Sequence, residues 1–89
     1  MKIKYRLQVS EVAGQYIGVA VGEDARKYKN IIFLNKVAKY IVDLLQNEMT
    51  QEEVVAAVQT KYDASESLIR EETLYFLEKL SELDLLSNE

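Results

Sequence analysis

Ile31-Ile32-Phe33-Leu34-Asn35 is the stretch that decides how the chain divides into strands and helices. Four bulky apolar residues run into an asparagine, and a helical pattern of apolar residues starts directly after it. Such a run is typical of a strand, and asparagine is a preferred residue at the N-cap of a helix. We therefore predict a strand at 31–35 that ends where a helix begins.

Two further strands are predicted before this stretch. Residues 5–9 alternate between apolar and polar side chains, and residues 16–21 are rich in β-branched and aromatic ones. Both patterns are typical of strands. Gly14-Gln15 lies where a hairpin turn is needed, and Gly22-Glu23-Asp24 interrupts the second strand. As the last of three strands, 31–35 can form an open edge of the sheet, and an open edge can bind another peptide.

Three helices follow, at 36–46, 51–61 and 66–82. The first has apolar residues at helical spacing, namely Val37, Ile41, Leu44 and Leu45. Thr50 and Glu53 have the spacing of a capping box at the start of the second. The predicted fold class is α+β: a three-stranded antiparallel sheet followed by a three-helix bundle, winged helix-turn-helix-like, in a single domain spanning 1–89.

The composition excludes several kinds of cofactor site and a membrane-spanning segment. The 89 residues contain no cysteine and no histidine, which excludes most zinc, haem and iron–sulfur sites, so we expect no cofactor and no metal. The chain has no apolar run of membrane-spanning length and no apolar signal segment at its N-terminus. We therefore expect a cytoplasmic protein without a membrane partner.

Catalysis finds little support in the sequence. No histidine is present to activate a serine, and the glycines Gly14, Gly18 and Gly22 do not match a phosphate-binding motif. The acidic pairs Glu52-Glu53 and Glu71-Glu72 lie on predicted helices with an apolar opposite face, as solvated helix surfaces do. We therefore expect a protein that is not an enzyme and has no catalytic residues.

The charge is divided unevenly along the chain. Residues 1–40 carry eight basic and three acidic side chains, whereas residues 41–89 carry three basic and twelve acidic ones. The last helix and tail, 66–89, hold seven of those acidic residues and would be repelled by phosphates, which argues against a nucleic-acid partner. A winged-helix transcriptional regulator is kept as an alternative, because the basic strand half could meet a phosphate backbone.

A set of residues spread over almost the whole chain forms a recognisable pattern. It consists of Phe33-Leu34-Asn35, Ala38, Ile41, Leu44-Leu45, Thr50, Glu53-Val54, Tyr62-Asp63, Phe76-Leu77, Leu80 and Leu85-Leu86. With this pattern the chain resembles the PqqD-like family, small peptide-binding domains also called RiPP recognition elements. Two positions depart from it. The family often has glycine where this chain has Asn47-Glu48, and again before the terminal leucine pair, where this chain has Asp84.

The resemblance implies a function and a site. Such domains bind the leader segment of a ribosomally made precursor peptide and present it to a modifying enzyme, such as a radical SAM maturase. The leader adds as an extra strand to the third strand, beside a groove against the last helix. The expected peptide-binding residues are Lys29, Ile31, Ile32, Phe33, Leu34, Arg70, Thr73, Leu74 and Leu77.

Some of these assignments remain open on the sequence alone. On a helical wheel, Ile69, Thr73, Phe76 and Leu80 form the core stripe of the last helix. Leu74 and Leu77 either line the groove, or complete the core or rest half-exposed. Lysines near the third strand, Lys27, Lys29 and Lys36, either steer an acidic leader or protect the edge against aggregation. The same edge could also form a homodimer, in which case the chain would be a structural or dimerisation module.

Overall fold

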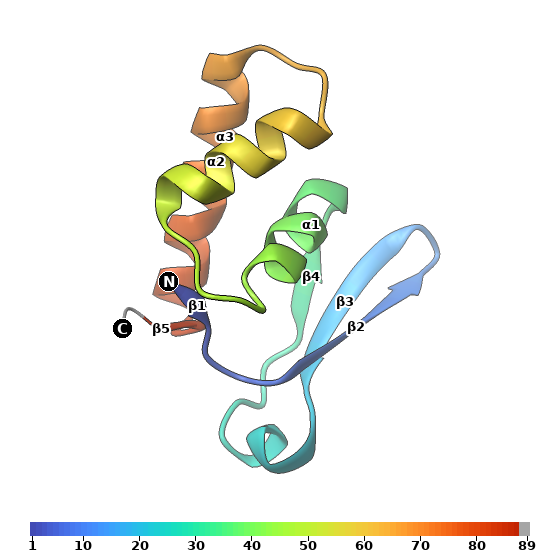
Figure 1. The fold of residues 1–89 in the computed structure, drawn as a ribbon. Coiled ribbons are helices and arrows are strands. Elements are labelled where there is room, and N and C mark those ends of the chain that lie inside the picture. Colours follow the sequence, from blue (N-terminus) through green and yellow to red (C-terminus); the bar gives the residue numbers. More distant parts are fainter. Residues whose placement is uncertain (88–89) are drawn as a thin grey trace.

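The computed structural model describes residues 1–87 and has the predicted α+β architecture. Its helices are α1 (Lys36–Leu44), α2 (Gln51–Lys61) and α3 (Glu66–Glu82), with a short 3-10 helix, η1 (Gly22–Arg26). The strands are β1 (Lys2–Ile3), β2 (Leu7–Val12), β3 (Gln15–Ala20), β4 (Ile32–Leu34) and β5 (Leu86–Ser87). β2, β3 and β4 form the antiparallel sheet, in that order, and the helices lie to one side of it (Figure 1).

The hairpin between β2 and β3 turns one residue earlier than predicted. Val12 pairs with Gln15, so the two turn residues are Ala13 and Gly14. Both have positive φ, 51° and 81°, as the two-residue turn that matches the strand twist requires. Gln15 is therefore the first residue of β3, and the turn assigned to Gly14-Gln15 was wrong by one position.

The core lies between the sheet and the helices. α1 packs on β3 and β4, while α2 and α3 pack on each other and on α1. The largest fully buried side chains are Ile41, Val42, Leu45, Val54, Val58, Thr73, Leu80 and Leu85. Within residues 1–87, no helix is both long and apolar enough to cross a membrane.

Local capping fixes where each helix begins. The Asn35 side chain accepts a hydrogen bond from the N–H of Ala38 at 2.8 Å, which ends β4 and starts α1 as predicted. Thr50 and Glu53 form the predicted capping box, with reciprocal bonds of 2.8 and 3.1 Å. Ser65 caps α3 by accepting from the N–H of Leu68 at 3.3 Å. These short-range signals set the helix starts in the sequence and in the structure alike.

A second small sheet joins the two ends of the described chain. β1 pairs antiparallel with β5, and the N–H of Ile3 donates to the carbonyl of Leu45 at 2.8 Å. The pair therefore ties the end of α1 to the segment after α3. We did not predict it, because a strand of two residues has no measurable period.

Asp84 adopts a backbone conformation that favours glycine. Its φ is 59°, its N–H donates to the carbonyl of Ser81, and the N–H of Leu85 donates to the carbonyl of Leu80. These two bonds form a Schellman C-cap on α3, and Leu80 and Leu85 are both buried in the same core cluster. The departure at Asp84 therefore keeps the backbone geometry of a glycine cap. The chain also departs from the family pattern at Asn47-Glu48, after α1. Asn47 has no positive φ, so this turn does not use a left-handed residue.

The Asp84 cap yields a stability prediction. Asp84→Gly should be more stable than Asp84→Ala by about 1 kcal/mol, because glycine adopts positive φ without the steric cost that a Cβ adds. Both variants remove the ion pair between Asp84 and Lys4, so their difference isolates the backbone term. Urea unfolding of the two variants measures this difference in the free energy of unfolding. Equal stability of the two variants would contradict the left-handed assignment.

Candidate functional site

β4 is the edge strand of the three-stranded sheet. It pairs with β3 through Tyr16↔Leu34, Ile17↔Phe33 and Gly18↔Ile32, and no strand among residues 1–87 lies along its other side. The expectation of an edge at the third strand is therefore met in the described chain. The open question becomes which backbone groups this edge exposes.

The hairpin fixes the direction of the hydrogen bonds in β3. Val12 and Gln15 flank a two-residue turn, so they form a hydrogen-bonded pair, and such pairs alternate with non-bonded ones along an antiparallel ladder. The N–H of Val21 donates to the carbonyl of Arg6 at 2.9 Å, which fits the same alternation. The odd-numbered residues of β3 therefore bond to β2.

It follows that Tyr16 and Gly18 direct their backbone groups toward β4. Their partners Leu34 and Ile32 bond inward to β3, and Phe33 forms the non-bonded pair. The N–H and C=O of Phe33 consequently point away from the sheet, toward the open edge. The residue exposes a donor and an acceptor where another strand can pair.

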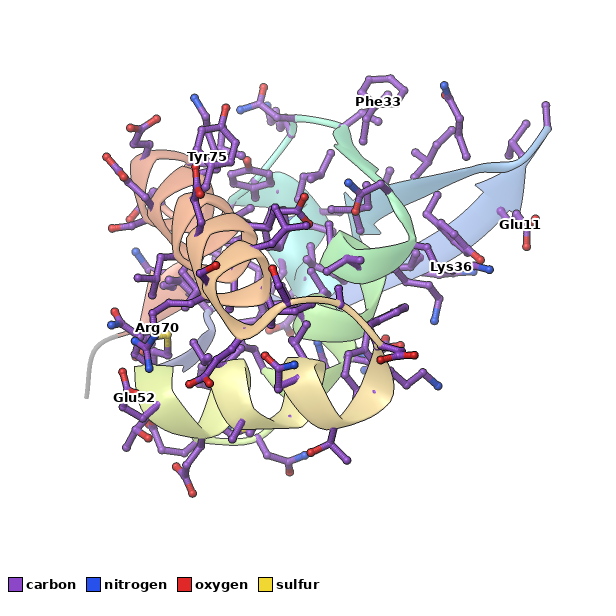
Figure 2. All side chains as sticks on the ribbon, turned by 90° about the horizontal axis from the view of Figure 1, so that it is seen from above. Glu11, Phe33, Lys36, Glu52, Arg70 and Tyr75 are labelled. Atoms are coloured by element: carbon purple, nitrogen blue, oxygen red, sulfur yellow. The ribbon has the colours of Figure 1, made fainter. Side chains whose placement is uncertain are left out.

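The side chains of β4 alternate in the same way between the two faces of the sheet. Ile32 and Leu34 are 6% and 5% exposed and belong to the core, whereas Ile31 and Phe33 are 58% and 68% exposed. The strand is thus anchored by one face, while its other face and its outer edge are accessible. Phe33 points outward in Figure 2.

A hollow of about 380 Å³ lies beside the C-terminal end of β4, between the start of α1 and α3. Its lining combines an apolar part with polar and acidic groups: Asn35, Val37, Ala38, Glu71, Glu72, Tyr75 and Phe76. Tyr75 stands on the outer side of α3, and Phe33 lies across from it on the same side of the molecule (Figure 2). Phe33 and Leu34 themselves line a second hollow on the hairpin side, and Asn35 borders both hollows. We refer to the edge of β4 and the adjoining hollow on α3 as the β4–α3 groove.

The acidic groups of the β4–α3 groove have no cationic partner in the described chain. Neither Glu71 nor Glu72 takes part in an ion pair within residues 1–87. Lys79 lies a turn further along, with its Nζ 5.4 Å from the centroid of the Tyr75 ring and 3.6 Å from Glu82. The hollow therefore has a net negative lining, and both glutamates are exposed, as expected for a solvated helix face.

The predicted strand residues lie at the edge, but the predicted helix residues are mostly elsewhere. Lys29 is exposed just before β4. Thr73 and Leu77 are 0% and 5% exposed in the core, and Leu74 is half-buried and packed against it. Arg70 does not line the hollow; it forms two hydrogen bonds to Glu52 on α2, at 2.6 and 3.1 Å (Figure 2).

The predicted core stripe of α3 is confirmed at Ile69, Thr73 and Leu80 and wrong at Phe76. The buried residues of α3 are Ile69, Thr73, Leu77 and Leu80, and Phe76, placed in the core by the sequence, is half-buried and lines the hollow. The buried stripe depends on where α1 and α2 press against α3, which apolar spacing alone does not define. The missed lining residues did leave a signal: Glu71 and Tyr75, like Glu72 and Phe76, are four residues apart and so share one side of the helix.

Two of the three lysines that were considered for steering a peptide lie outside the hollow beside α3. Lys27 lies 3.7 Å from Asp24 in the loop that contains η1. Lys36 flanks the edge strand, because it lines a second hollow together with Phe33 and Leu34 and with Glu11 and Tyr16 of the hairpin. Neither lines the hollow beside α3.

The pair between Arg70 and Glu52 joins α2 to α3 and shifts both pKa values. The hydrogen bonds from Arg70 hold the pKa of Glu52 below its ordinary value, and the same bonds raise the pKa of Arg70. Glu53, one residue along, has a lowered pKa for a different reason, the N–H of Thr50 in the capping box. In the described chain Arg70 thus contacts α2 and does not line the hollow.

The fold and the groove define a class of protein: a small α+β chain with an accessible edge strand beside a hollow on its last helix. The chain belongs to the PqqD family, since the model of that family, described as Coenzyme PQQ synthesis protein D (PqqD), matches residues 9–86.

A solved structure described as "TbiB1 in Complex with the TbiA(beta) Leader Peptide" has a similar fold. The TM-score is 0.72 at 20% sequence identity, and the match covers 100% of this chain and 98% of that one. At this identity the likeness establishes the fold. No curated protein matches the chain significantly.

The burial pattern of β4 predicts opposite effects for neighbouring residues. Ile32→Ala should destabilise the fold by about 2–4 kcal/mol, because it removes a buried side chain and leaves a cavity. Phe33→Ala should change stability by no more than about 0.5 kcal/mol, since its side chain is exposed. Denaturant unfolding of both variants measures this. A larger effect of Phe33→Ala would mean that β4 pairs in a shifted register.

The ion pair at Arg70 predicts a dependence on pH. Arg70→Gln should raise the pKa of Glu52 toward its ordinary value of 4.5, as followed by NMR of the side-chain carboxyl. Because the folded-state pKa is lowered, the pair stabilises the fold above the unfolded pKa, and this contribution disappears as the pH falls through the folded value. The stability difference between wild type and variant should therefore shrink in acid. The pKa of Glu53 serves as the control and should not move.

Proposed function

We propose that the chain is a non-catalytic peptide chaperone that binds the leader segment of a ribosomally synthesised precursor peptide by strand addition at β4. It would present that peptide to a modifying enzyme, such as a radical SAM maturase, and residues 1–89 would act as one peptide-binding domain. The observation that carries the proposal is the outward N–H and C=O of Phe33 beside a hollow. Membership of the PqqD family and the likeness to a fold solved with a leader peptide support it.

The geometry of β4 suggests how such a peptide would be read. A strand added at the edge pairs with Phe33, and its side chains alternate between the two faces of the extended sheet. The peptide residue opposite Leu34 would direct its side chain toward the helices and the hollow. The residue opposite Phe33 would direct its side chain outward, next to the Phe33 ring. The backbone would thus set the register and the hollow would select the side chain.

The proposal is tested by separating the backbone donor of Phe33 from its side chain. Phe33→Pro removes the outward N–H, and Phe33→Ala removes only the ring, so proline should weaken binding far more than alanine. The probe is the leader segment of a candidate precursor peptide, titrated into the ¹⁵N-labelled chain. We expect shifts at the amides of 29–35 and of 71–76, and new protection of the Phe33 amide against hydrogen exchange.

Two results would count against strand addition. Equal affinities of Phe33→Pro and Phe33→Ala would show that the edge donor is not used, provided that both variants remain folded by circular dichroism. A stable dimer in sedimentation without peptide, with the Phe33 amide already protected, would favour the dimerisation module instead. In that case the edge would be occupied by a second copy.

A further inference from the structure

We infer that the peptide strand bound at β4 carries a basic side chain, arginine in preference to lysine, that enters the hollow and pairs with Glu71 and Glu72. The inference rests on the proposed function and names the chemical class of its peptide. It favours a peptide of opposite charge to the acidic leader that was one of the two alternatives considered for the lysines near the third strand.

The position of the hollow selects one residue of the added strand. Asn35, Val37 and Ala38 form one wall, directly after the end of β4, and α3 forms the other. A peptide residue opposite Leu34 points to the helix side of the sheet, as Leu34 itself does. It is therefore the side chain at this position that reaches the acidic lining.

Electrostatics favours a cation at that position. Glu71 and Glu72 have no cationic partner within residues 1–87, and no lysine or arginine lines the hollow. An acidic side chain would meet two like charges, and an apolar one would cover carboxylates without replacing the water bound to them. A basic side chain would form charge-assisted hydrogen bonds with the same carboxylates.

The aromatic residues of the hollow sharpen the choice to arginine. Tyr75 and Phe76 line it next to the carboxylates, and Tyr75 is 62% exposed. A guanidinium group can stack on an aromatic ring while it pairs with a carboxylate, whereas an ammonium group is a point charge that is more strongly hydrated. Lys79 already lies over the Tyr75 ring at 5.4 Å, so one face of this ring accepts a cation in the described structure.

The test selects binding peptides from a random library, so that no particular peptide sequence has to be assumed. A library of random twelve-residue peptides, displayed on their encoding messenger RNA, is selected on the wild-type chain and in parallel on Phe33→Pro. We expect the sequences enriched on wild type, but not on Phe33→Pro, to share an arginine or lysine at a fixed distance from apolar positions. The basic residue and an apolar residue two positions away would lie on the same face of the added strand.

Charge variants then assign the preference to its residues. The double variant E71Q/E72Q should bind the selected arginine peptide about fivefold more weakly, and E71K/E72K should prefer the same peptide with glutamate in place of arginine. E78Q is the matched control, because Glu78 lies on the same helix, is exposed and does not line the hollow. It should bind like wild type. Raising the salt concentration should reduce the difference between wild type and E71Q/E72Q.

The outcomes separate the two proposals. Edge-dependent peptides without a basic residue, or a basic preference that survives in E71Q/E72Q and E71K/E72K, would overturn the inference and leave strand addition intact. If no peptide is enriched on wild type over Phe33→Pro, both the inference and strand addition fail. A switch from arginine to glutamate in E71K/E72K would establish the assignment, since a merely structural role of the two glutamates would not exchange the preferred charge.

Discussion

The burial of Ile32 and Leu34 is the constraint on which the site depends. Because side chains of a strand alternate between two faces, a slip of one residue would place Ile31 and Phe33 in the core and expose the two residues that now fill it. The same register directs the backbone of Phe33 to the open edge. Core packing therefore determines which donor and acceptor the protein offers to a partner.

Features set by contacts between residues close in the sequence were predictable, whereas features set by contacts between distant residues were not. Asn35 and Thr50 act on neighbours three residues away, so the starts of α1 and α2 were predictable from the sequence alone. The pairing of Ile3 with Leu86 joins the two ends of the described chain and has no local signature. The turn at Ala13 was missed by one residue, because alanine rarely adopts the positive φ that it has there.

The edge strand of the candidate site was predictable from the sequence, whereas the residues of α3 that line the hollow were not. The edge half follows from strand order and from the apolar run before Asn35, both of which are visible in the sequence. The helix half depends on the rotation of α3 about its axis, and Phe76 and Leu77 exchange between core and hollow if that rotation changes by one residue. Helix packing sets this rotation through contacts with α1 and α2, which are distant in sequence.

The free energy of backbone hydrogen bonds at β4 is small compared with the cost of binding an extended peptide. The two outward groups of Phe33 can form two hydrogen bonds, and each contributes about 0.5–1.5 kcal/mol net. Their total of about 1–3 kcal/mol must offset the freedom that an extended peptide loses on binding, which is of the same order or larger. A millimolar complex already requires about 4 kcal/mol after those costs. Under the proposed strand addition, backbone pairing at so short a strand would align a peptide, and its affinity would need further side-chain contacts. The hollow with Glu71 and Glu72 is the candidate for those contacts.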